Sequence, residues 1–291
     1  GGGIGSFFHS YAEKTAELSA AGLAFDPKDI DVLEYAFNDL LLTGVEQGVV
    51  GLALCLALLL LVFRSLWNKS RALAYGLLSL LIFSLFSYPF ELLPYQIVAV
   101  IIMAYSATDD KGVRINAAVV GVVSVVLALL PWDYSMAKQK AEDDYRMIAG
   151  ITEKAFVNDY YELLPLLEDN RNFLFDFGKM LSVQGRYNDS NAMLRKGTLL
   201  SNDPMFYVLQ GNNYKQMGLN DKAEAMYRKA YLIMPNRLYP LYKLMLLYKD
   251  NNDRKGMKAM ATRVLNFQEK VKSPATREMK KEAKQIIEEK N

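Results

Sequence analysis

The chain has 291 residues, of which 52% are hydrophobic and 23% charged, and its formal net charge is +2. This near balance of charge does not indicate a polyanionic partner such as a nucleic acid. A single cysteine, Cys55, and a single histidine, His9, exclude an intrachain disulfide and a metal centre built from several such residues. The length predicts about two domains, and the apolar residues are concentrated between positions 45 and 132.

The first 43 residues are polar and predict a loop that precedes a membrane region. Tyr11–Leu23 has a helical composition, which Gly22 would end, and Asp26 and Pro27 begin a turn. We expect a second helix over Asp31–Leu42 that runs into the membrane. The chain opens with GGGIGSFF and lacks a signal peptide, so we interpret it as the C-terminal part of a longer protein with further membrane helices before it.

Apolar stretches between residues 44 and 132 predict a transmembrane region of about four helices. The first stretch is continuously apolar and long enough to cross a bilayer. The third is short and contains Pro94. The four predicted spans are Val45–Phe63, Ala72–Tyr88, Leu92–Tyr105 and Ile115–Leu130.

The distribution of lysine and arginine predicts how these spans are oriented. Both residue types occur in the loops 64–71 and 106–114 and are absent from 88–95. The positive-inside rule therefore places the two basic loops in the cytoplasm. The opening loop and everything after residue 132 would then lie in the periplasm of a Gram-negative bacterium, with the protein in its inner membrane. If the third stretch does not span, the C-terminal part lies in the cytoplasm instead.

Residues 171–291 contain an internal repeat, which a helical connector at 133–170 precedes. Repeats are predicted at about 171–203, 204–237 and 238–271, followed by a polar capping helix at 273–290. Four positions recur at an offset of 33 and then, more weakly, of 34 residues: Gly178, Leu181, Gly185 and Ser190; Gly211, Tyr214, Gly218 and Ala223; Met245, Tyr248, Asn252 and Met257. The pattern resembles the tetratricopeptide repeat, a pair of helices, and predicts an all-α solenoid after the membrane helices.

Polar residues at the start of the first span are the strongest candidates for function. Asn38, Asp39 and Glu46 lie where this helix would enter the membrane. Polar side chains at such a boundary usually have a binding partner or a functional role. Gly44, Gly48 and Gly51 lie about one turn apart and would provide a smooth side for another backbone. The alternative is that the polar residues only cap the helix.

The spacing from Phe37 to Gly51, FND-x(6)-E-x-G-x-x-G, resembles the closing signature of the O-antigen ligase and polymerase family. The opening stretch Gly1–Phe7, with Tyr11, is similar to that family's loop opening, and the resemblance covers about residues 1–130. It implies transfer or polymerisation of an undecaprenyl-diphosphate-linked glycan onto a hydroxyl acceptor. No metal and no other cofactor is expected.

The resemblance also implies roles for individual residues. Asn38 and Glu46 would lie at the active-site side of the membrane. The family has a histidine where this chain has Phe37, and a phenyl ring cannot accept a proton. Glu34, Asp39 or Glu46 would have to serve instead. The expected sets are catalytic Asn38, Glu46, Asp39 and Glu34, and substrate-binding Phe37, Glu91 and Tyr11.

A different class of function remains open, a membrane-anchored repeat scaffold without catalysis that binds a protein partner. Phe37 in place of histidine favours this alternative, and the Glu46–Gly51 pattern argues against it. Glu91 would then be an ordinary acid of an interfacial loop. A transporter fragment is a third possibility, but the sequence has no paired broken helices.

Overall fold

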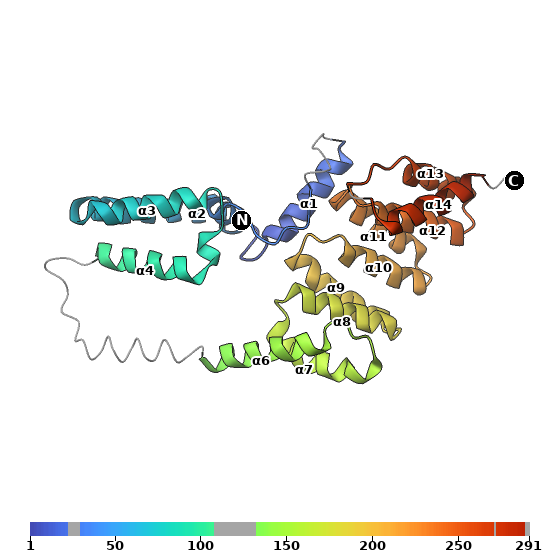
Figure 1. Ribbon diagram of the computed structural model, residues 1–291, viewed down its shortest axis with the longest axis horizontal. Coiled ribbons are helices and arrows are strands. Elements are labelled where there is room, and N and C mark those ends of the chain that lie inside the picture. Colours follow the sequence, from blue (N-terminus) through green and yellow to red (C-terminus); the bar gives the residue numbers. More distant parts are fainter. Residues whose placement is uncertain (23–29, 108–131, 271, 289–291) are drawn as a thin grey trace. The chain divides into compact units, whose positions relative to one another are not determined.

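The computed structural model describes residues 1–22, 30–107, 132–270 and 272–288. Every regular element among these residues is a helix, so the all-α fold class is confirmed for the part of the chain described. The chain divides into two compact units (Figure 1). The first unit comprises Gly1–Ser10 and Leu33–Met136, and the repeat unit comprises Tyr11–Val32 and Ala137–Asn291.

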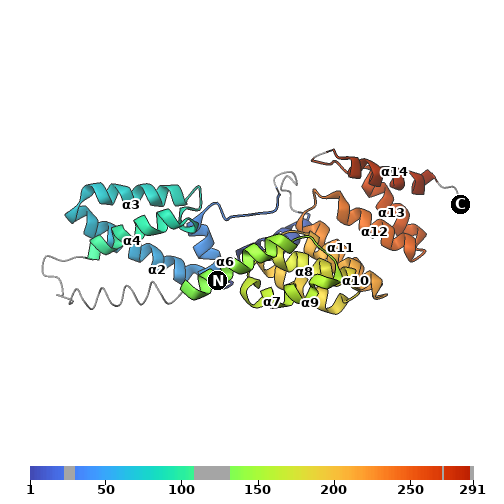
Figure 2. The same ribbon diagram turned by 60° about the horizontal axis from the view of Figure 1, so that its bottom comes forward.

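Three helices make up most of the described part of the first unit. They are α2 (Asp39–Lys69), α3 (Arg71–Ser84) and α4 (Leu93–Ala107), and a 3-10 turn, η2 (Pro89–Glu91), joins the last two. Both views show them side by side (Figures 1 and 2), and α2 contacts both α3 and α4. Their core is small and aliphatic: Val62, Leu66, Ala74, Leu77 and Ile102.

One helix among the described residues, α2, is long and apolar enough to cross a membrane. The predicted second and third spans correspond to α3 and α4, which are apolar but have only 14 and 15 residues. A straight crossing needs about 20 residues. Pro94 lies in the first turn of α4, where its missing N–H has no helical partner to lose. The predicted fourth span, Ile115–Leu130, lies outside the described residues.

The prediction of a helix over Asp31–Leu42 is wrong for its first eight residues. Residues 31–38 are not helical, and α2 begins at Asp39. The physical reason is the capping residue. Asn38 has an extended backbone, and its side chain accepts a hydrogen bond from the N–H of Leu41 at 2.8 Å, which fixes the helix start. The helix predicted at Tyr11–Leu23 is α1, which runs earlier, over Phe7–Ala20.

The helix α2 is interrupted at Gly48, which has φ 76° and ψ −176°. Next to this break, the N–H groups of Gly2 and Gly3 donate to the carbonyl oxygens of Val45 and Glu46, each at 2.9 Å. The glycine-rich stretch thus supplies hydrogen bonds where the helix is irregular. Of the three glycines predicted to receive another backbone, Gly48 does so among the described residues.

The repeat unit is a stack of antiparallel helix pairs (Figure 1). Each predicted repeat holds one pair, in which the two helices pack together, and successive pairs contact each other. The helices α6 and α7, with the short η3 between them, come before the first pair, and α14 covers the last. In order, the elements are α6 (Trp132–Ile148), η3 (Lys154–Phe156), α7 (Val157–Leu167), α8 (Arg171–Val183), α9 (Tyr187–Leu200), α10 (Met205–Gln216), α11 (Asn220–Ile233), α12 (Leu238–Asp250), α13 (Arg254–Leu265) and α14 (Pro274–Glu288).

The recurring glycines mark the closest approach of the two helices in a pair. A Cβ added to Gly211 would lie 2.5 Å from the Tyr227 ring, and one added to Gly178 would lie 2.7 Å from Leu194. Both contacts join residues 16 apart, so they are equivalent. In the third repeat the corresponding residues are Met245 and Ala261, both fully buried. In this pair the large side chain is on the first helix and the small one on the second. The combined side-chain volume of the pair therefore stays similar.

The turn inside each repeat has the same backbone conformation. Gly185, Gly218 and Asn252 occupy equivalent positions and have φ values of 76°, 73° and 58°. Left-handed conformations favour glycine, and asparagine tolerates them better than most residues. The weaker third copy of the repeat therefore has the same turn.

Candidate functional site

Asn38 and Asp39 tie the start of α2 to the segment that follows α3. The Asn38 side chain donates to the carbonyl oxygen of Leu85 at 3.1 Å, in addition to capping α2. The buried carboxylate of Asp39 accepts the N–H of Phe90 at 3.2 Å. The structure therefore gives both residues a structural role, and their assignment to catalysis stays a prediction.

Phe37 belongs to an aromatic cluster. Its ring packs edge-on against Tyr88 at 5.5 Å, and Tyr88 stacks on Tyr35 at 4.2 Å. Phe37 remains 59% exposed. This position, which holds histidine in the resembling family, is here an apolar contact beside the start of α2.

Glu34, Glu46 and Glu91 line one cavity of about 290 Å³ in the first unit. Three predicted site residues, from three separate stretches of the sequence, are thus brought together. The remaining walls come from the opening stretch with the start of α1, from the segment before α2, and from α2 itself: Ile4, Gly5, Phe8, Tyr35, Ala36 and Leu42. We call this the carboxylate cavity.

Tyr11 is not among the residues that line the carboxylate cavity. It belongs to the repeat unit, whereas the carboxylate cavity lies in the first unit. Across the described ranges, no cluster of three or more His, Cys, Asp or Glu side chains could hold a metal ion.

The repeat unit binds a part of the chain far away in sequence. Ala12 and Ala16 of α1 are buried in the same core cluster as helices α10 to α14. The ammonium group of Lys229 on α11 bonds the Glu13 carboxylate at 2.6 Å and lies 5.2 Å from the centre of the Tyr207 ring. These contacts anchor one end of the segment Tyr11–Val32.

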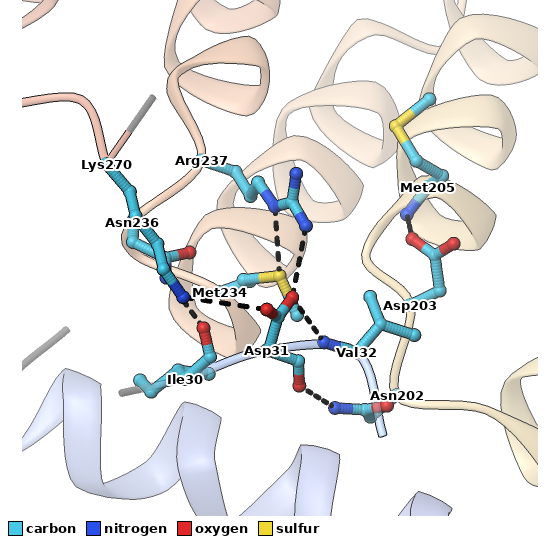
Figure 3. A network of polar contacts seen from close by, with 10 residues as sticks. All are labelled: Ile30, Asp31, Val32, Asn202, Asp203, Met205, Met234, Asn236, Arg237 and Lys270. Atoms are coloured by element: carbon cyan, nitrogen blue, oxygen red, sulfur yellow. Dashed lines mark hydrogen bonds and ion pairs between the residues drawn. The ribbon is translucent and has the colours of Figure 1, made fainter. Parts of the chain in front are cut away.

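The other end of that segment is held through its main chain (Figure 3). The side-chain amide of Asn236 donates to the carbonyl oxygen of Ile30 at 2.7 Å, and that of Asn202 donates to the carbonyl oxygen of Asp31 at 2.9 Å. Ile30 is only 5% exposed. Both amides therefore recognise peptide groups of a non-helical segment.

The Asp31 side chain faces positive charge. Its carboxylate lies 3.3 Å from the Arg237 guanidinium and 3.5 Å from the Lys270 ammonium group, and it accepts the N–H of Val32 at 2.9 Å (Figure 3). This N–H and the two cations hold the pKa of Asp31 below its usual range. A cavity of about 340 Å³, lined in part by Asp31, Arg237 and Lys270, lies beside these contacts. We call Asn202, Asn236, Arg237 and Lys270 the turn clamp.

The turn clamp comes from the turns that follow successive helix pairs. Asn202, Asn236 and Lys270 are each 34 residues apart and lie in the turns that follow α9, α11 and α13. Each of these three turns thus contributes one polar side chain to the clamp, at a different distance from the end of its helix. The sequence analysis did not identify these residues. Their contacts with residues 30–32 depend on segments 171 and 206 residues apart, which no local pattern indicates.

Neighbouring Asp203 has the opposite electrostatic character. It accepts the N–H of Met205 at 2.8 Å (Figure 3), but burial raises its pKa above the usual range. Asp203 therefore holds the first N–H of α10, and burial disfavours its charged form.

Comparisons with known proteins leave the family of the chain open. No protein-family model and no curated protein matches it. Among the solved structures that match, two are titled as crystal structures of MamA. The first is 17% identical and has a TM-score of 0.39, and the match covers 53% of this chain and 88% of the MamA chain. The second is 16% identical with a TM-score of 0.36 and covers 45% and 82%. The repeat architecture therefore rests on the helix pairs described above.

Proposed function

We propose that this protein is a helical-repeat scaffold that binds a polypeptide partner at the turns between its repeats. The observation that carries this proposal is the turn clamp, in which Asn202 and Asn236 hold two successive carbonyl groups of one segment. Stacked helix pairs also present an extended surface suited to a partner of this kind.

Recognition through the main chain explains how such a site gains affinity. A carbonyl group that leaves water must regain a hydrogen bond, and the two asparagine amides provide one to each of two peptide groups. Side chains then add specificity, as in other modes of peptide binding. In the clamp this second part falls to Arg237 and Lys270.

A peptide-binding measurement tests the proposal. The probe is a fluorescein-labelled peptide with the sequence of residues 27–35, PKDIDVLEY. It is titrated by fluorescence anisotropy into the full chain in detergent. The chain carries Ile30→Gly and Asp31→Lys, which remove side-chain contacts of residues Ile30–Val32, here called the resident segment. We expect saturable binding that is lost when Asn202→Ala and Asn236→Ala are added.

The matched control is Asn251→Ala in the same background. Asn251 lies at a turn inside a repeat and accepts a hydrogen bond from Asn220 at 2.7 Å, so its loss should leave peptide binding unchanged. Absence of binding in the background variant, with its helical circular dichroism retained, would overturn the proposed function.

The carboxylate cavity favours a second candidate, glycan transfer of the O-antigen ligase type. Its volume is close to the lower end of the roughly 300–1,000 Å³ typical of ligand pockets. Glu46 or Glu34 would accept the proton of the acceptor hydroxyl, and Glu91 would contact a sugar. We propose with it a polytopic membrane region around α2, α3 and α4, in the bacterial inner membrane, with the repeats in the periplasm. This arrangement rests on the lysine and arginine distribution.

The cleanest test of glycan transfer uses Glu46→Gln and Glu91→Gln in the full-length gene, expressed in a deletion strain. Gel display of the surface glycan should show loss of the long glycan at unchanged protein level. Asn38→Ala is a poorer test, because it also removes a helix cap and the bond to Leu85. Glu142→Gln, on a partly exposed site of α6, is the control. A wild-type glycan in both glutamine variants would exclude this candidate.

A further inference from the structure

We propose that residues Ile30–Val32 are a built-in competitor for the partner site, and that the partner carries an acidic residue directly after an aliphatic one. This inference rests on the proposed scaffold function. It specifies both the chemistry that the turn clamp selects and the segment that a partner must displace.

The contacts of the resident segment define what a partner needs. The clamp takes two successive carbonyl groups, with Asn236 on the first residue and Asn202 on the second. The first residue is buried, and isoleucine occupies it here. The second residue must be acidic, since its side chain faces Arg237 and Lys270. The clamp therefore selects an aliphatic–acidic pair in a non-helical stretch.

Each ion pair of the resident segment is weak enough for the acidic residue of a partner to replace it. The side chains of Asp31 and Arg237 are 58% and 54% exposed, and that of Lys270 is 47% exposed. Exposed ion pairs are screened by water and salt and contribute little. The segment is held instead by the sum of its few contacts and by its attachment to α1.

That attachment makes the segment an effective competitor. Glu13, Ala12 and Ala16 fix α1 to the repeats, so Ile30 and Asp31 stay close to the clamp. A short tether of this kind gives an effective concentration on the order of 1 mM. A partner of moderate affinity must overcome this local concentration, and the apparent affinity of the intact chain falls accordingly.

The experiment compares the intact chain with the variant that lacks the resident contacts. The labelled peptide PKDIDVLEY is titrated into the full wild-type chain and into Ile30→Gly/Asp31→Lys, both in detergent. A second peptide carries lysine at the position of Asp31. We expect the variant to bind the first peptide at least tenfold more tightly than wild type does. The lysine peptide should bind the variant at least tenfold more weakly than the first peptide.

Hydrogen exchange of the amides at residues 30–32 gives an independent measurement in the unmodified chain. Addition of the first peptide should increase their exchange, because the segment is released. Equal affinities of wild type and variant, or unchanged exchange at saturating peptide, would refute the competitor while leaving the scaffold function intact. Equal binding of the two peptides would refute the acidic preference. Failure of both chains to bind either peptide would overturn the scaffold function itself.

Discussion

At the scale of residues, the packing inside a repeat depends on pairs of complementary size. Gly211 is small because the Tyr227 ring lies where a Cβ would be. The equivalent pair in the third repeat, Met245 and Ala261, satisfies the same volume with the sizes exchanged. Gly211 lies in the interior of helix α10, where glycine is unfavourable. Its presence there is therefore explained by packing against Tyr227.

This packing leads to a prediction about Gly211→Ala. The added methyl group would lie 2.5 Å from the Tyr227 ring, so we expect the repeat unit to lose about 1–3 kcal/mol of stability. Denaturant unfolding followed by circular dichroism measures this loss. In a Tyr227→Ala background the ring is gone, as at Ala261 of the third repeat, and the same substitution should cost clearly less. Equal costs in the two backgrounds would disprove the proposed contact.

The charge of Asp31 predicts how the resident segment depends on pH. Its pKa is lower in the folded chain than in the unfolded one, so its contribution is present above the unfolded pKa and is lost as pH falls through the folded value. Hydrogen-exchange protection of residues 30–32 should therefore hold from pH 8 to 5, after correction for intrinsic exchange rates, and fall below about pH 4. Asp31→Asn should remove this dependence. Protection that falls equally in both chains would argue against the ion pairs.

Asp203 follows Asn202 of the turn clamp, and its pKa shift is opposite to that of Asp31, so its predicted pH dependence has the opposite sign. Because burial raises its pKa, the folded state disfavours its charge and loses stability as pH rises through the folded pKa. Asparagine can still accept the N–H of Met205. Thermal unfolding of Asp203→Asn at pH 7 should thus occur at the wild-type temperature or above it. Asp203→Ala lacks the acceptor and should lose about 1 kcal/mol. A clear destabilisation by asparagine would contradict this account.

At the scale of elements, the break in α2 is the distinctive feature of the first unit. Gly48 has a positive φ, and a Cβ there would lie 2.5 Å from the Gly1 nitrogen. The break lies two residues after Glu46, so it adjoins the carboxylate cavity. Helix geometry and site geometry are therefore linked in this segment.

Two glycine substitutions in α2 should differ for this reason. Gly48→Ala introduces strain and a backbone clash, and we expect a loss of about 1–3 kcal/mol in the first unit. In Gly44→Ala the new methyl group meets only Leu52, at 3.5 Å, and helix propensity improves by up to about 1 kcal/mol. Thermal unfolding in detergent distinguishes the two. Similar unfolding temperatures for both variants would mean that the break does not contribute to stability.

At the scale of the whole molecule, the two units share no core cluster among the described residues, which predicts one unfolding event for each unit. The core around Val62 and Leu77 contains only residues of the first unit, and the clusters of the repeat unit contain none of these. Differential scanning calorimetry should resolve two transitions, of which Gly211→Ala lowers one and Gly48→Ala the other. Effects on separate cores should add. A single transition that both substitutions shift would show that the units unfold together.

Local patterns in the sequence predicted most of the elements of this chain. The recurrence of Gly178 and Gly211 identified the repeat, because close helix packing constrains residue size at a fixed spacing. Apolar runs located α2, α3 and α4, since helices of this kind need continuous hydrophobic sequence. The start of α2 was misplaced, because residues 31–38 have ordinary helical composition and a single cap at Asn38 decides where the helix begins.

The sequence by itself therefore determined the all-α class and the repeat period, and it identified Glu34, Glu46 and Glu91 as candidate site residues. Only the tertiary structure decided which of those acids share a cavity. It alone showed that Asn38 and Asp39 tie the start of α2 to the segment after α3. It also revealed the turn clamp. Asn202 and Asp31 are 171 residues apart, and their hydrogen bond depends on how the chain returns on itself. Local periodicity records neighbours along one helix, whereas contacts between distant segments arise only when the whole unit is packed.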